Sequence, residues 1–95
     1  MQEIDPNAVQ ADYQSEGTDR IIRCIKMQDD EFGISWWMAP KDRPDEVFLV
    51  TRTLPELTFR IYRKGHVKPF AFALSPSTAA YYVVCDLDVR GIRAA

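Results

Sequence analysis

The sequence predicts a mainly β domain of the α+β class: an antiparallel meander of about six strands, forming a curled sheet or a small open barrel, with one short N-terminal helix. Apolar and polar residues alternate through three short segments between residues 46 and 74, and this period of two is typical of strands. Turn-forming residues separate the segments at hairpin spacing. The 95 residues, 46% hydrophobic and 27% charged, suffice for one domain with a single core.

We divide the chain into an acidic N-terminal arm with a short helix, residues 1–19, and a single β-rich domain, residues 20–95. Asp5 suits a helix cap and Pro6 suits the first helical position, so a helix is expected over residues 6–14. Of the formal net charge of −2, the arm holds −5 and the remainder +3. Two interpretations stay open: the arm packs on its own domain, or it docks on a basic partner. The acidic residues of the arm are Glu3, Asp5, Asp12, Glu16 and Asp19.

The first two strands are expected over residues 20–27 and 32–39. β-branched residues favour a strand over 20–27, although the spacing of its isoleucines also fits a helix. The acidic cluster at residues 28–31 is typical of a hairpin turn. In the second strand, Trp36 is expected to face the core and Trp37 the opposite side, because successive strand side chains alternate.

Three strands at residues 46–53, 57–63 and 67–74 form the centre of the predicted meander. Residues 46–53 are apolar on both faces, which is typical of a central strand covered on both sides. Residues 57–63 alternate most regularly. Pro69 removes one ladder donor from the third strand, which favours a sheet edge or a bulge.

The last strand is predicted over residues 81–89, where apolar side chains recur at every second position. A helix is the alternative, because Ser75 could cap one and several apolar residues also recur at helical spacing. The alternating positions are more numerous, so we predict a strand. The residues that also fit a helix are Ala80, Val83, Val84 and Leu87.

Several classes of protein receive no support from the sequence. No apolar run approaches the roughly 20 residues that a bilayer requires, so no membrane partner is expected. The N-terminus is acidic where a secretory signal would be basic and then apolar, so a cytoplasmic location is expected. Cys24 and Cys85 fit no metal or redox spacing; we expect reduced, buried thiols, with a disulfide between them as the alternative.

No catalytic constellation is evident, so we expect no enzyme, no cofactor and no metal. His66 is the only histidine and falls in a predicted turn, and no serine or cysteine lies in a nucleophile motif. Asp86 and Asp88 would share a face of the last predicted strand and could hold a hard cation there. Solvated carboxylates on a strand face are the simpler interpretation.

These patterns favour a small non-enzymatic protein–protein interaction module, such as an inhibitor, adaptor or assembly subunit. Aromatic residues predicted to lie outside the core, beside arginine, are typical of protein interfaces. The protein would bind another protein or itself, as a homo-oligomer, through this surface or through a sheet edge. Alternatively, the N-terminal helix covers the aromatic side chains. The predicted protein-binding residues are Trp37, Tyr62, Tyr82 and Arg60.

The alternative function is binding of single-stranded nucleic acid by a basic and aromatic sheet face. Basic and aromatic side chains are interleaved in the predicted meander, and faces of this kind contact phosphates and stack on bases. The net negative charge of the chain opposes this function, and a solvated sheet face explains the same residues. The predicted nucleic-acid-binding residues are Arg52, Arg60, Tyr62, Arg63, Lys64 and Lys68.

Overall fold

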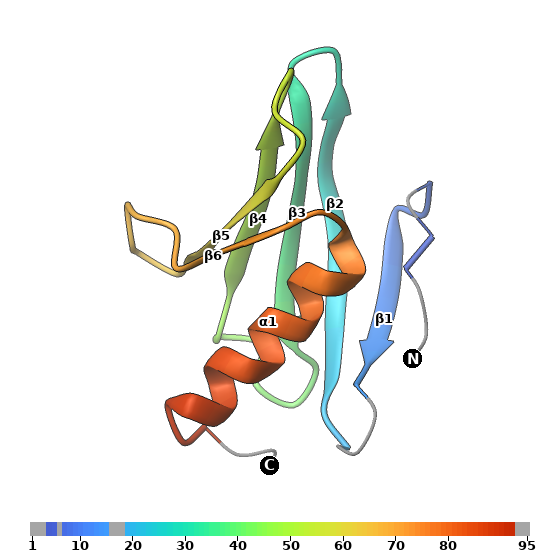
Figure 1. Cartoon of the computed structure of the whole chain (residues 1–95). Coiled ribbons are helices and arrows are strands. Elements are labelled where there is room, and N and C mark those ends of the chain that lie inside the picture. Colours follow the sequence, from blue (N-terminus) through green and yellow to red (C-terminus); the bar gives the residue numbers. More distant parts are fainter. Residues whose placement is uncertain (1–3, 6, 16–18, 93–95) are drawn as a thin grey trace.

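The fold is one six-stranded antiparallel sheet with a helix against it (Figure 1). The structure, a computed structural model, describes residues 4–5, 7–15 and 19–92. The strands lie in the sheet in chain order, so the sheet is an open meander with β1 and β6 at its edges. The elements are β1 (Gln10–Gln14), β2 (Ile21–Asp30), β3 (Gly33–Pro40), β4 (Phe48–Thr53), β5 (Phe59–Arg63), β6 (Ala71–Ala73) and α1 (Pro76–Val89).

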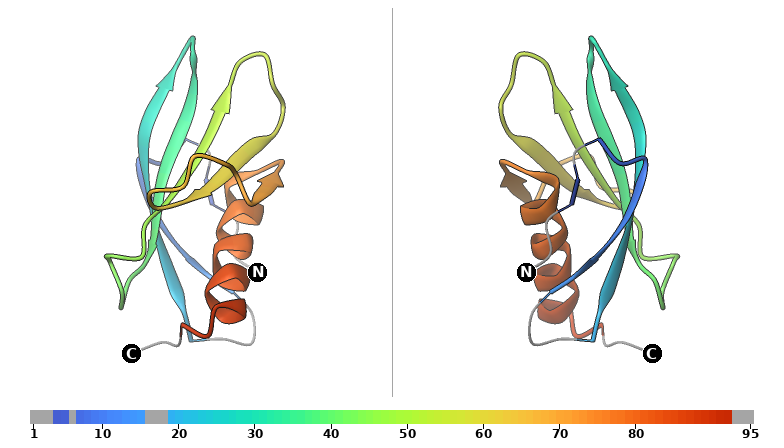
Figure 2. Two further views of the ribbon diagram at one scale, coloured as in Figure 1. Left: turned by 90° about the vertical axis from the view of Figure 1, so that its left-hand side faces the viewer. Right: turned by 90° about the vertical axis from the view of Figure 1, so that its right-hand side faces the viewer.

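The mainly β meander is confirmed, but the predicted position of the helix is wrong. The helix α1 follows the last strand near the C-terminal end, and Figure 2 shows it along one face of the sheet. Residues 10–14 of the expected N-terminal helix form β1 instead, and residues 81–89, expected as the last strand, belong to α1. In the described part of the chain, no helix combines the length and the apolar character that crossing a membrane requires.

β1 forms because its side chains alternate between the core and solvent. Tyr13 is completely buried opposite Ile22 of β2, whereas Asp12 beside it is exposed. The helix-start signal at Asp5 makes only a local turn, in which the Asp5 carboxylate accepts a hydrogen bond from the Asn7 N–H at 2.9 Å. A helix this short is marginal in water, whereas a strand gains ladder hydrogen bonds with β2. The described part of the acidic arm therefore packs on its own domain.

α1 forms because Ser75 and Pro76 start a helix where the chain leaves β6. The Ser75 hydroxyl accepts a hydrogen bond from the Thr78 N–H at 3.2 Å, and Pro76 occupies the first turn, where its missing N–H costs nothing. Val83 and Leu87, four residues apart, satisfy both a period of two and a helical period, which explains why the alternation is misleading. The buried residues of α1 are Ser77, Ala79, Ala80, Val83, Val84, Asp86 and Leu87.

The hydrophobic core lies between α1 and the sheet face that α1 covers. Trp36 is completely buried there, as predicted, whereas the next residue, Trp37, is partly exposed. Helix residues such as Val83 and Leu87 pack in the same core. The buried sheet residues of this core include Tyr13, Ile22, Cys24, Trp36, Met38, Phe48, Val50, Phe59 and Ile61.

The β2–β3 hairpin is fixed by the chemistry of its turn. The Asp30 carboxylate accepts hydrogen bonds from the N–H groups of Phe32 (2.9 Å) and Gly33 (3.3 Å), and these bonds lower the pKa of Asp30. Gly33 is required by close packing, because a Cβ atom there would lie 2.4 Å from the carbonyl oxygen of Arg52. The predicted hairpin is confirmed, but its turn lies at residues 31–32, because residues 28–30 of the acidic cluster belong to β2.

Candidate protein-interaction face

The face of the sheet opposite α1, here called the open face, presents a continuous row of apolar side chains. In the antiparallel register Ile25 pairs with Trp37, Trp37 with Leu49, and Leu49 with Tyr62. These four residues, here called the apolar row, cross β2, β3, β4 and β5 at one level. Side chains at directly opposed positions share a face and lie within contact distance. The row is therefore one surface feature assembled from four strands.

The apolar row is exposed because its neighbours in sequence occupy the core. Trp36 and Phe48 point toward α1, so Trp37 and Leu49 must point away from it. Leu49 lies on an interior strand and is still 46% exposed. A large aliphatic side chain exposed in the middle of a sheet shows that α1 covers one face only. The expectation that residues 46–53 are covered on both sides is therefore wrong.

Polar groups border one side of the apolar row. There the hydroxyl oxygens of Ser35 on β3 and Thr51 on β4 lie 3.0 Å apart and form a hydrogen bond. Arg60 pairs with Thr51 in the ladder and forms an ion pair with Glu56 at 2.6 Å. An apolar centre with a polar border is the usual composition of a protein interface.

A shallow hollow lies beside the apolar row at the β5 end. It has a volume of about 350 Å³ and is lined by Leu49, Tyr62 and the turn that follows β5. Gly65 in this turn has a φ of 76°, the left-handed conformation that glycine adopts without strain. Exposed His66 of the same turn lines the hollow.

The structure brings together three of the four predicted protein-binding residues. Trp37, Tyr62 and Arg60 lie on the open face, whereas Tyr82 lies on α1 and lines a separate hollow with Phe72. The fold thus places Tyr82 away from the apolar row. Two members of the apolar row, Ile25 and Leu49, were not among the predicted binding residues. They are identified only by the register in which the strands pair, and no local sequence pattern specifies that register.

The predicted nucleic-acid-binding residues are divided between the two faces of the sheet. Arg52 and Arg63 point to the side of α1, where Arg52 lies over the Phe59 ring and Arg63 binds Asp86. Arg60 and Tyr62 point the other way, and Arg60 is paired with Glu56. Exposed Lys64 and Lys68 lie in the connection from β5 to β6.

Asp86 lies in a buried ionic cluster on α1, which rules out the predicted strand face shared with Asp88. The Asp86 side chain is only 3% exposed, and both its oxygens accept hydrogen bonds from Arg63 Nε, at 2.9 and 3.0 Å. Arg90 Nε donates to the same carboxylate at 2.8 Å. The hydrogen bonds with Asp86 raise the pKa of Arg63. This cluster connects α1 to β5, and Asp88 is exposed on another side of the helix.

The remaining reactive side chains are dispersed. Cys24 and Cys85 are both free thiols, so the alternative of a disulfide is wrong. Burial raises the pKa of Cys24 to about 12, which keeps it protonated and unreactive at neutral pH. Within residues 4–5, 7–15 and 19–92, no three His, Cys, Asp or Glu side chains gather where they could hold a metal ion.

Comparisons with models of protein families, with curated proteins and with solved structures gave no match.

Proposed function

We propose that this protein is a non-enzymatic protein–protein interaction module that binds through the open face of its sheet. The observation that supports this is the apolar row, which crosses four strands and includes a half-exposed leucine on an interior strand. A contiguous apolar patch with a polar border favours burial against another protein, because apolar area leaves water with a gain of about 25 cal/mol per Å².

The partner that we favour is a second copy of this chain. A two-fold axis parallel to the strands, between β3 and β4, would set Trp37 of one copy against Leu49 of the other and Ile25 against Tyr62. Every member of the row would then meet an apolar residue, as a self-complementary interface requires. Two sheets packed in this way keep their strands within about 30° of each other and lie roughly 10 Å apart.

The open face is a better candidate than the sheet edges. β6 has three residues and β1 has five, so either edge offers few unpaired backbone groups for strand addition. The row, in contrast, offers two aromatic side chains, and aromatic residues dominate the binding energy of many interfaces.

Sedimentation equilibrium tests the proposal, with the wild type compared with Leu49→Lys. We expect a dimer for the wild type and a monomer for Leu49→Lys, because the charge would be buried at the centre of the interface. Leu57→Lys is the matched control, since Leu57 is 76% exposed in the connection between β4 and β5; it should remain a dimer. A wild-type protein that stays monomeric up to about 1 mM, the concentration at which even weak association becomes measurable, would contradict self-association.

Binding of single-stranded nucleic acid is the second candidate function. The hollow beside Tyr62 is bordered by Lys64 and His66, and an aromatic ring beside basic groups can stack a base and contact its phosphate. The test is titration with a fluorescent oligonucleotide at several salt concentrations. Affinity that falls steeply with salt and is lost in Tyr62→Ala would support it; absent or salt-independent binding would remove it.

A further inference from the structure

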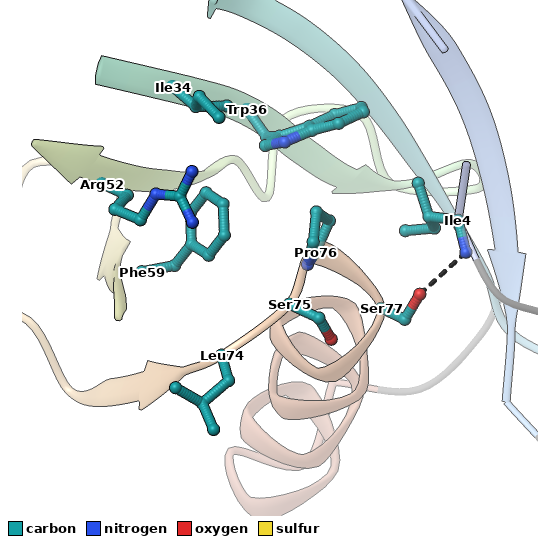
Figure 3. A pocket seen from close by; sticks show the side chains of 9 residues that line it. All are labelled: Ile4, Ile34, Trp36, Arg52, Phe59, Leu74, Ser75, Pro76 and Ser77. Carbon is teal, nitrogen blue, oxygen red and sulfur yellow. Dashed lines mark hydrogen bonds between the residues drawn. The ribbon is translucent and has the colours of Figure 1, made fainter. Parts of the chain in front are cut away.

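A separate pocket lies on the other side of the sheet, where α1 begins (Figure 3). Its volume is about 330 Å³, which lies within the range of sites for small molecules. The walls are largely apolar: Ile34 and Phe59 come from the sheet, and Leu74 precedes the helix. Ile4 closes one side, where its N–H donates to the Ser77 hydroxyl at 2.7 Å.

Among the residues that the structure describes, two hydrogen-bond donors of this pocket have no hydrogen-bond partner. Trp36 is completely buried, yet its indole Nε1–H makes no hydrogen bond, and Figure 3 shows that nitrogen on the ring edge facing the pocket. The Nε atom of Arg52 is also buried without a hydrogen-bond partner. A buried donor without an acceptor destabilises the fold, and an acceptor bound in the pocket would remove this penalty.

The electrostatics of the pocket favour an anion. Arg52 is the only charged residue among the described residues that line it. Its guanidinium lies over the Phe59 ring, 5.0 Å from the centroid, which holds the charge toward the pocket. The first turn of the 14-residue helix α1, from Ser75 to Ser77, forms another wall, and the N-terminal end of a helix carries a partial positive charge.

We propose that this pocket binds a short organic carboxylate. The carboxylate would accept hydrogen bonds from Arg52 and from the Trp36 indole N–H, near the first turn of α1. Its hydrocarbon chain would lie against Ile34, Phe59 and Leu74, which have no polar side-chain atoms to offer. This site is independent of the proposed interaction face, because the two lie on opposite sides of the sheet.

The test is an NMR titration of the full chain with hexanoate, following the two indole N–H signals. Trp36 and Trp37 are the only tryptophans, and a Trp37→Phe variant assigns them. We expect the Trp36 signal to move saturably at hexanoate concentrations below about 10 mM, a weak but specific affinity. The Trp37 signal, from the open face, should not move. Hexanamide, which has the same chain without the charge, should bind at least about tenfold more weakly.

Substitution of Arg52 decides the role of the pocket. Arg52→Gln should weaken hexanoate binding at least about tenfold, the usual effect of losing a charge-assisted hydrogen bond. Arg60→Gln is the matched control, because Arg60 lies on the open face, and it should bind like the wild type. Trp36→Phe is a second variant, which removes the N–H and keeps an aromatic ring. It should also weaken hexanoate binding, and because it lacks the Trp36 indole, its titration is followed by the backbone amide signals of Ile34 and Ser77, which line the pocket. No movement of the Trp36 signal, equal binding of hexanamide, or unchanged binding by Arg52→Gln would each overturn the proposal.

Discussion

Trp37 on β3 lies directly opposite Leu49 on β4, on the sheet face that α1 leaves uncovered. Their sequence neighbours Trp36 and Phe48 are fully buried on the other face. A shift of register by one residue would exchange the two sets and place Trp36 in solvent. Because Trp36 and Phe48 are buried on one face, Trp37 and Leu49 must lie on the other. The apolar row therefore stays exposed in the monomer whichever rotamers its side chains adopt.

Removing either aromatic member of the apolar row should weaken self-association while the monomer stays folded. Trp37 and Tyr62 are partly exposed in the monomer, so Trp37→Ala or Tyr62→Ala should each weaken dimerisation by about 2 kcal/mol or more, as at interface hot spots. Sedimentation equilibrium measures the effect, and circular dichroism checks the fold. Tyr82→Ala is the matched control on α1. An equal loss in Tyr82→Ala would contradict the assignment of the interface to the open face.

Asp86→Asn should destabilise the fold. The substitution leaves Arg63 and Arg90 facing a neutral amide in a site where the Asp86 side chain is 3% exposed. Removing one partner of a buried ion pair costs about 3–5 kcal/mol; because both arginines are 32% exposed, we expect about 2–3 kcal/mol. Urea unfolding provides the measurement. Asp88→Asn, on the exposed side of the same helix, should change stability by less than about 0.5 kcal/mol, and equal losses in both variants would refute this role for Asp86.

The two thiols should differ in reactivity. Cys24 is completely buried and its pKa is raised by burial to about 12, whereas Cys85 is partly exposed. A thiol reagent at neutral pH should modify at most Cys85 in the native protein and both cysteines after unfolding. Rapid modification of Cys24 in the native state would show that β2 opens.

Because the pKa of Cys24 is raised in the folded state, its contribution to the free energy of unfolding should depend on pH. Folding favours the protonated thiol, so this contribution is full below the ordinary pKa of 9.0 and is lost as pH rises toward 12. The unfolding free energy of Cys24→Ala should therefore fall less steeply than that of the wild type between these pH values. Parallel curves in urea unfolding across this range would contradict the assignment.

The meander was predictable from the sequence because it depends on local chemistry. Asp30 and Gly33 stabilise the β2–β3 turn. The alternation of side chains along β3 correctly places Trp36 in the core and Trp37 on the opposite face of the sheet. The strands between residues 20 and 74 follow from these signals, although β6 is shorter than expected.

The two errors in the predicted fold, the N-terminal helix and the last strand, arise where local sequence signals compete with tertiary contacts. Asp5 and Pro6 suit the start of a helix, but Tyr13 is buried against β2, and residues 10–14 form the strand β1 instead. In α1, Val83 and Leu87 are four residues apart, a spacing that fits both the strand period of two and the helical period. Only the packing of these residues against the sheet distinguishes a helix from a strand. The capping signal at Ser75 was present in the sequence and correctly indicates the helix start.

The candidate sites were less predictable than the fold. Trp37, Tyr62 and Arg60 follow from alternation, but Leu49 joins them only through the pairing of three strands. The opposite orientation of Arg52 and Arg60 also depends on which face α1 covers. A property that depends on strand order and on the position of a helix distant in sequence is not present in any local pattern.

If the open face is buried in a dimer, the surroundings of Trp37 must change when the dimer dissociates, and an NMR dilution series measures this change. The indole N–H signals of Trp36 and Trp37 report the two faces of the same strand, so each serves as a control for the other. We expect the Trp37 signal to change with protein concentration along the dimerisation curve, while the Trp36 signal stays constant. A Trp37 signal that is independent of concentration, in a protein whose mass shows a dimer, would place the interface on a surface other than the open face.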